Sequence, residues 1–237
     1  MKKHIPNLFT LGNLVCGLLA INEILVNQRL DVAAYLILGG LGFDFLDGMI
    51  ARLLKVSGEL GKQLDSLADM VSFGVVPGFI AYYLLEENGF PYPYLGFMIT
   101  LFSALRLAKF NIDTRQSDSF IGMPTPANTM IWISIPAIIN SNAELLSDVF
   151  SNPFSIAGLV IALSFLLTAE LPLLALKFKN LSWKFNKNRW IFLGLSLCML
   201  LTLGVAYHTI FIPLPFIILL YLIVSIITTN SKNEEKV

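Results

Sequence analysis

Long apolar stretches, separated by short runs rich in Gly, Pro, Asn and charged residues, fill most of this 237-residue chain. Most stretches are about 20 residues long, the length that an α-helix needs to cross the hydrocarbon core of a bilayer. We therefore expect an all-α fold, a polytopic integral membrane bundle of about eight transmembrane helices. The expected helices cover about residues 6–26, 32–55, 61–85, 92–111, 125–147, 153–177, 189–208 and 211–229.

Composition supports a membrane protein, because 56% of the residues are hydrophobic and the mean hydropathy is +0.73. Such a chain is too apolar for a soluble domain, so residues 1–237 are expected to form one membrane-embedded domain. Five residues precede Pro6, too few for a cleavable signal ahead of the first span, which we expect to be retained. Cys16 and Cys198 fall in expected helices, where they give neither a disulfide framework nor a metal-binding spacing.

The distribution of charge predicts the orientation. With both termini in the cytosol, every Lys and Arg except Arg29 lies on the cytosolic side, as the positive-inside rule requires. Residues 177–189 alternate Lys with aromatic side chains and are expected to lie on anionic lipid headgroups. The formal net charge of zero argues against a general nucleic-acid binder.

Four carboxylates stand out in this apolar sequence: Asp44, Asp47, Asp65 and Asp69. Ionised groups are costly inside a membrane, so a functional site is the first hypothesis for them. Each pair has helical spacing, three and four residues apart, and therefore projects from one helix face. A turn near Ser57 and Gly58 would make the two helices antiparallel and bring all four carboxylates to a similar depth at the cytosolic end.

Like charges this close need a cation, and an all-oxygen cluster suits Mg²⁺ or Mn²⁺ rather than zinc. Gly48 and Ala51 leave room beside the carboxylates, and Arg52 adds a cation able to hold a phosphate bidentately. Gly61 would let a ligand lie against the backbone. In the first helix, Thr10, Asn13 and Gly17 recur at helical spacing, which favours a packing face.

Further along, Pro77 and Gly78 predict a kink in the third helix. The fourth helix ends with Arg106, Lys109 and Asn111 near the cytosolic surface, and a proline-stiffened turn around Thr125 follows. These groups are candidates for binding an anionic second substrate. Glu170, in the sixth expected helix, receives no role.

The fixed positions of the central stretch form the pattern D-x2-D-G-x2-A-R-x8-G-x3-D-x3-D, which begins at Asp44 and ends at Asp69. The pattern resembles the signature of the CDP-alcohol phosphatidyltransferase family without departure. Within that family, the segments LDSLADMVSFGVVP, ALRLAKFN and FIGMPTPAN are most similar to the phosphatidylserine synthases. In ALRLAKFN, Lys109 stands where arginine is expected in an RLARFN-like segment, and it keeps the charge but not the bidentate fork.

The resemblance implies a phosphatidyltransferase that makes phosphatidylserine and CMP from CDP-diacylglycerol and L-serine, with two divalent ions, Mg²⁺ or Mn²⁺. It implies Asp44, Asp47, Asp65 and Asp69 as metal ligands, Asp69 also being the general base. It also implies a homodimer. The distribution of Lys and Arg predicts that the active site faces the cytosol from the cell (inner or plasma) membrane. We expect a catalytic core over about residues 1–128, additional helices over about 129–229 and a tail at 230–237. The implied CDP-diacylglycerol contacts are Gly48, Ala51, Arg52, Ser57, Gly58, Gly61, Thr10 and Asn13. The implied serine contacts are Arg106, Lys109, Asn111 and Thr125.

Two alternatives remain open at this point. The signature is shared with phosphatidylglycerophosphate synthase and other CDP-alcohol phosphatidyltransferases, and Arg106, Lys109 and Arg115 would suit a phosphorylated acceptor. A divalent-cation transporter is an alternative of a different class, because intramembrane carboxylates also mark ion pathways. The outer halves of the same helices carry no matching acidic pair, which argues against a path through the membrane.

Overall fold

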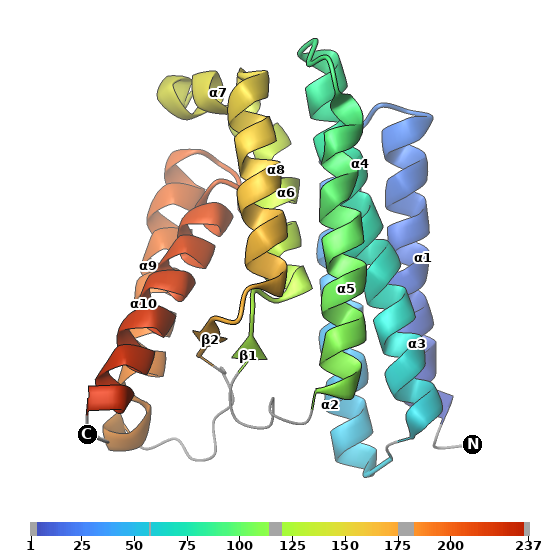
Figure 1. Cartoon of the computed structure of the whole chain (residues 1–237), viewed down its shortest axis with the longest axis vertical. Helices are drawn as coiled ribbons and strands as arrows, with labels where there is room; N and C mark the ends of the chain where they lie inside the picture. Colours follow the sequence, from blue (N-terminus) through green and yellow to red (C-terminus); the bar gives the residue numbers. More distant parts are fainter. Residues whose placement is uncertain (1–3, 57, 114–119, 175–182, 235–237) are drawn as a thin grey trace.

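The computed structural model shows a bundle of helices that run roughly side by side (Figure 1). It describes residues 4–56, 58–113, 120–174 and 183–234. Ser57, Arg115 and part of the basic 177–189 loop therefore lie outside the described residues. The elements are α1 (Ile5–Leu25), α2 (Leu30–Leu54), α3 (Glu59–Asp69), the π-helical turn η2 (Met70–Val75), α4 (Val76–Glu87), the 3₁₀ turn η3 (Pro93–Phe97), α5 (Met98–Ile112), β1 (Phe120–Ile121), α6 (Thr125–Ile139), α7 (Glu144–Ser151), α8 (Pro153–Thr168), β2 (Pro172–Leu173), α9 (Trp183–Ala206) and α10 (Pro213–Glu234).

The expected membrane bundle is confirmed. Among the described residues, five helical stretches are long and apolar enough to cross a bilayer, and α7 with α8, bent by 79°, forms a sixth candidate. Two shorter apolar helices, Thr125–Ile139 and Pro213–Thr228, stand where the other two spans were expected. The count of eight spans stays a prediction. The start of α1, the turn after α2 and the end of α10 all lie at one end of the bundle (Figure 1).

Two expected helices are shorter than the sequence predicted. The helix expected to reach residue 147 ends at Ile139, where the hydroxyls of Ser141 and Ser147 donate to the last carbonyls, of Ile138 and Ile139, at 2.7 and 2.9 Å. These side chains replace the backbone donors that a longer helix would supply.

The second correction concerns the helix expected to reach residue 177. It ends at Thr168, because Pro172 has no N–H to donate to the Thr168 carbonyl and disfavours helical geometry at Leu171. The chain then pairs as β2 with β1, with Phe120 opposite Leu173 and Ile121 opposite Pro172.

The irregularity expected at Pro77 appears just before it, as the π-helical turn η2 within the continuous span Glu59–Glu87. Pro77 cannot donate to the carbonyl of Phe73, and the hydroxyl of Thr129 on α6 donates to that carbonyl instead, at 2.9 Å. A neighbouring helix thus supplies the donor that the π-helical turn lacks, because a backbone carbonyl inside a membrane needs a hydrogen-bond partner from the protein.

One face of α1 packs against the helices that carry the four aspartates. Its buried positions include Thr10, Asn13, Gly17 and Ala20, which confirms the predicted packing face. At Gly17 a Cβ atom would lie 2.5 Å from the Ser72 hydroxyl and 3.0 Å from the Ser72 Cα, so only glycine allows α1 and η2 to approach this closely. The close contact sets Thr10 and Asn13 beside the carboxylates.

Candidate active site

The predicted carboxylate hairpin is present. α2 ends with Lys55 in the left-handed region, φ 52°, and α3 starts after Gly58, so the chain reverses direction between them. Oxygen atoms of Asp44, Asp47 and Asp65 all lie within 4.8 Å of one another. α1 packs against both α2 and α3, whereas α2 and α3 pack sparsely on each other. The carboxylates therefore face a gap that backbone does not fill.

Asp69 lies one turn deeper on the helix that carries Asp65. It is within electrostatic range of the other three carboxylates but outside their tight cluster. Asn13 Nδ2 donates to Asp69 Oδ1 at 3.2 Å, and the backbone carbonyl of Asn13 accepts from the Ser72 hydroxyl at 2.9 Å. Asn13 thus fixes the orientation of Asp69, and its contact with the lipid substrate stays a prediction.

Thr10 plays the same part for Asp47. Its hydroxyl donates to Asp47 Oδ2 at 2.7 Å, and both side chains are buried. Asp65 Oδ1 is buried without a hydrogen-bond partner among the described residues. A buried anionic oxygen without a donor suits a cation as its partner.

The donor set fits a divalent metal ion. Three carboxylates within one small volume supply only hard oxygen ligands, which Mg²⁺ and Mn²⁺ prefer. The hydrogen bond from Thr10 leaves the second oxygen of Asp47 available, as in sites where outer partners orient the ligands.

A pocket of about 420 Å³ adjoins the cluster, within the range of about 300–1,000 Å³ typical of small-molecule sites. Among the residues expected there, Thr10, Gly48, Ala51, Gly58 and Gly61 line it. Arg52 does not; its Nε donates to the Gly48 carbonyl at 2.9 Å on the exposed side of α2. Three further polar residues, not predicted from the sequence, line it as well: His4, Asn7 and Lys62.

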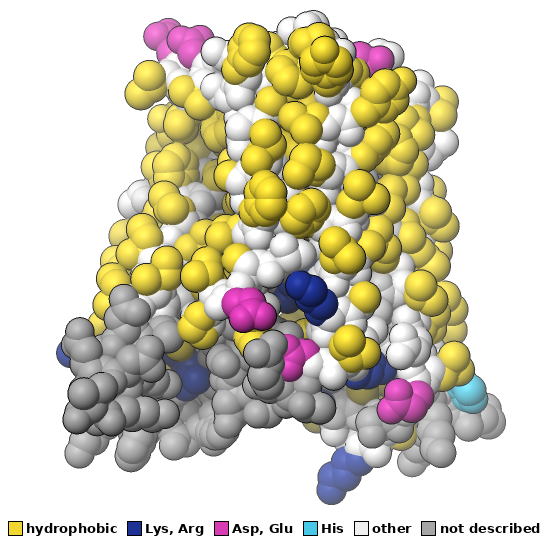
Figure 2. All heavy atoms as spheres, in the orientation of Figure 1, with side chains coloured by type: hydrophobic (Ala, Val, Ile, Leu, Met, Phe, Trp, Pro, Cys, Tyr) yellow, Lys and Arg dark blue, Asp and Glu magenta, His cyan; other side chains and the backbone are white. Residues whose placement is uncertain are grey.

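A second, smaller groove opens beside α5 at the same end of the bundle. The end of α5 contributes Arg106, Lys109, Phe110 and Asp113 to its walls, and the end of α8 contributes residues 167–170. Figure 2 shows a basic patch beside acidic side chains at this level, below a broad band of hydrophobic side chains. Two of the four predicted serine contacts, Arg106 and Lys109, share this groove.

The other two predicted serine contacts lie elsewhere. Asn111 contacts α3, where its Nδ2 donates to the Ser66 hydroxyl at 2.9 Å. Its backbone carbonyl accepts from Lys62 Nζ at 2.7 Å. Thr125 is fully buried at the start of α6, and its hydroxyl has no partner among the described residues. Neither residue lines the groove.

Arg106 is the most unusual residue of this groove. Only 7% of it is exposed, its Nε has no hydrogen-bond partner, and in the described part of the chain no carboxylate forms an ion pair with it. The Phe110 ring lies 5.8 Å from its guanidinium carbon, and Asp69 is within electrostatic range. A buried cation without an anion is costly, so this position suits an anionic ligand group.

Comparisons with known proteins agree with this geometry. The sequence model described as CDP-alcohol phosphatidyltransferase matches residues 3–178. A CDP-diacylglycerol–serine O-phosphatidyltransferase from Bacillus subtilis is 38% identical over 141 residues, which are 58% of this chain and 77% of that protein. The Helicobacter pylori protein of the same name is 37% identical over 134 residues, 54% of this chain and 55% of its own length. An archaetidylserine synthase from Methanothermobacter thermautotrophicus is 31% identical over 170 residues, 70% of this chain and 68% of that protein.

Proposed function

The chain belongs to the CDP-alcohol phosphatidyltransferase family, and from that premise we propose that it makes phosphatidylserine and CMP from CDP-diacylglycerol and L-serine. The observation that carries the proposal is the meeting of three features at one end of the bundle. The cluster of Asp44, Asp47 and Asp65, the adjoining pocket and the groove around Arg106 lie together there. Relatives named for this reaction support serine as the acceptor.

Asp44, Asp47 and Asp65 are the residues that we propose to hold divalent ions, Mg²⁺ or Mn²⁺, with Asp69 contributing to a second ion. The bound ions would supply charge stabilisation for the diphosphate and its leaving phosphate. Gly48, Ala51, Gly58 and Gly61 present little side-chain bulk to the pocket, so a nucleotide can lie close to the backbone there. Lys62 adds a cation to the same wall; one of its three N–H groups donates to the Asn111 backbone carbonyl, and the others can donate to a phosphate oxygen.

In the reaction, the hydroxyl oxygen of L-serine forms a bond to the lipid-bearing phosphorus of CDP-diacylglycerol. The bond from that phosphorus to the bridging oxygen breaks, and CMP leaves with the electron pair. Asp69 accepts the hydroxyl proton as general base, held in place by Asn13. Arg106 interacts electrostatically with Asp69, and with the serine carboxylate held at Arg106 the hydroxyl would face the base.

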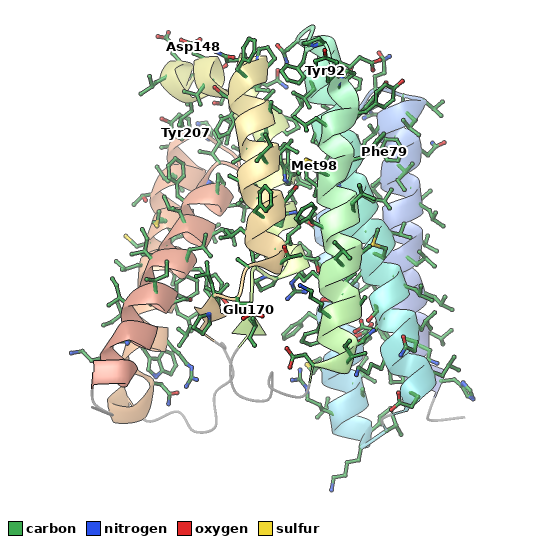
Figure 3. All side chains as sticks on the ribbon, in the orientation of Figure 1. Phe79, Tyr92, Met98, Asp148, Glu170 and Tyr207 are labelled. Atoms are coloured by element: carbon green, nitrogen blue, oxygen red, sulfur yellow. The ribbon has the colours of Figure 1, made fainter. Side chains whose placement is uncertain are left out.

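We further propose that the site faces the cytosol from the cell membrane. Arg52, Lys55, Lys62 and Lys109 all lie at the carboxylate end, whereas the exposed acids of α7 lie at the other end, where Figure 3 labels Asp148. A homodimer is the expected assembly, and chemical cross-linking in native membranes tests it.

Release of CMP by the purified protein in detergent tests the proposed function. The assay contains CDP-diacylglycerol and Mn²⁺ or Mg²⁺ and compares L-serine, glycerol 3-phosphate, inositol 1-phosphate and no acceptor. We expect release that depends on L-serine. Release of CMP with another acceptor alone would overturn the assignment of serine but support a phosphatidyltransferase. No release with any acceptor would make a cation transporter the hypothesis to test next.

Replacing Thr10 by valine should weaken metal activation. The substitution keeps the side-chain shape but removes the hydroxyl that orients Asp47, and loss of such an outer partner costs about 10- to 100-fold in metal affinity. The concentration of Mn²⁺ that gives half-maximal rate should rise accordingly. Thr202→Val on α9, whose hydroxyl donates to the Cys198 carbonyl, is the matched control and should leave it unchanged.

Replacing Arg106 by glutamine should raise the KM for L-serine by about 10- to 100-fold, the worth of a charge-assisted hydrogen bond. Because Arg106 is buried without an ion pair among the described residues, its neutralisation should not lower the melting temperature. Arg29→Gln, at the exposed opposite end, serves as control. An unchanged dependence on serine in both Arg106→Ala and Lys109→Ala would exclude this groove as the acceptor site.

A further inference from the structure

Glu170 lies on the wall of the groove opposite Arg106 and Lys109. It follows the last turn of α8, and Figure 3 labels it between that helix end and the β1–β2 pair. Its side chain is exposed to the groove, and no hydrogen bond or ion pair joins it to another described residue. The groove thus carries the cations of Arg106 and Lys109 and the carboxylate of Asp113, which has an interaction of its own, on the α5 side, and an available carboxylate, Glu170, on the α8 side.

Backbone contacts hold the segment that carries Glu170 in place. Gly122 N donates to the Leu171 carbonyl at 2.9 Å, and Met123 N donates to the Leu166 carbonyl at 3.0 Å. Gly122 has φ +76°, and a Cβ atom there would lie 2.6 Å from the Leu167 carbonyl oxygen. Only glycine permits this close approach, so the turn fixes where the residues after α8 can lie.

Helix α10 fixes the other end of the same segment. The Tyr221 hydroxyl donates to the Leu174 carbonyl at 3.0 Å, and the Ser225 hydroxyl accepts from Leu174 N at 3.1 Å. Glu170 therefore stands on a segment held on both sides, by the β1 turn and by α10. A site on a held segment can position a ligand group, which a free surface loop cannot do as well.

The arrangement of charges matches a small zwitterion. Arg106, buried and without an ion pair in the described chain, calls for an anionic group at the inner end of the groove. Glu170 offers a carboxylate to a cationic group at the outer wall. An α-amino acid carries both charges on one carbon, whereas a phosphorylated acceptor would bring only negative charge against Glu170.

We propose that Glu170 binds the ammonium group of the acceptor, so that the groove between α5 and the end of α8 selects an amino acid over acceptors without an amine. The proposal rests on the function proposed above and adds a residue that determines its specificity. In this arrangement the acceptor carboxylate lies at Arg106, its ammonium at Glu170, and its hydroxyl is left to face Asp69.

The test compares L-serine with 3-hydroxypropanoate, which has the same hydroxyl and carboxylate but no amine. Glu170→Gln should raise the KM for L-serine about tenfold or more with kcat within about threefold, because a charged hydrogen bond is lost. The KM for 3-hydroxypropanoate should not rise, so the preference for serine falls by the same factor. Glu170→Asp keeps the charge and should recover part of the preference.

Glu144→Gln, an exposed acid on α7 at the opposite end, is the matched control and should behave as the wild type. An equal rise in KM for both acceptors, or no change in either, would overturn the role of Glu170 while serine-dependent release by the wild type keeps the proposed function. If Glu170→Gln does not fold, the KM values of Glu170→Asp provide the test. A second test compares L-alanine with propanoate as competitive inhibitors of the wild type. Equal inhibition by these two compounds would also overturn the role of Glu170. Wild-type protein that releases no CMP with serine would overturn both proposals.

Discussion

Replacing Asp65 by asparagine should lower serine-dependent CMP release by about 1,000-fold or more. The change keeps the size of the side chain but removes one of three negative charges within 4.8 Å of one another. Its Oδ1, buried and without a donor in the described structure, is the ligand atom with no competing role. Loss of metal stabilisation costs several kcal/mol of transition-state stabilisation, and each 1.36 kcal/mol is tenfold in rate.

The same substitution should weaken binding of Mn²⁺ measured directly, by electron paramagnetic resonance of the free ion. Asp31→Asn is the control, because Asp31 is an exposed acid near the other end of α2. Asp31→Asn should retain both the binding of Mn²⁺ and the wild-type rate of CMP release. A variant Asp65→Asn that kept both the wild-type rate and the wild-type Mn²⁺ affinity would remove the cluster from the mechanism.

Much of the site side of the bundle could be predicted from sequence, because it depends on local rules. The spacing of Asp44, Asp47 and Asp65 along two helices, together with the turn near Gly58, was enough to bring the carboxylates together. Long apolar stretches predicted α1 and α2 to within two residues. Here periodicity and length decide the structure, and tertiary contacts only refine it.

What the sequence could not predict depends on contacts between helices. The hydrogen bond from Asn13 to Asp69 could not be predicted, because it depends on the close approach of α1 to η2 that Gly17 allows. The bond from Arg52 Nε to the carbonyl of its own helix was also not predictable, and the predicted contact of Arg52 with a phosphate stays a prediction. Side chains of this length reach several partners, and only the packed structure selects among them.

The second half of the chain shows the same limit more strongly. Glu170 was expected inside a long helix, where it had no evident role, but Pro172 ends that helix and the pairing of β2 with β1 turns the segment towards α5. The helix-ending proline was visible in the sequence. The pairing was not, because two-residue strands leave no periodic pattern.

Replacing Asp69 by asparagine should lower kcat by about 10²- to 10⁴-fold, the usual contribution of a general base. Asparagine keeps the acceptor oxygen for the Asn13 amide, so the local packing should persist, but it cannot take the proton of the serine hydroxyl. The KM for L-serine should change little, since Arg106 and not Asp69 is assigned to its carboxylate. The measurement is the rate of CMP release at saturating serine.

Comparison with Asp65→Asn separates the two carboxylate roles. Asp69 lies outside the tight cluster of Asp44, Asp47 and Asp65, so Asp69→Asn should retain the Mn²⁺ ion held by that cluster, weaken only the second ion to which Asp69 contributes, and lose the rate. The rate of CMP release by Asn13→Ala should lie between those of the wild type and Asp69→Asn, because the substitution removes the hydrogen bond that orients the base but leaves the base itself. Release by Asp69→Asn at more than a tenth of the wild-type rate would assign the proton to another acceptor and reduce Asp69 to an electrostatic role.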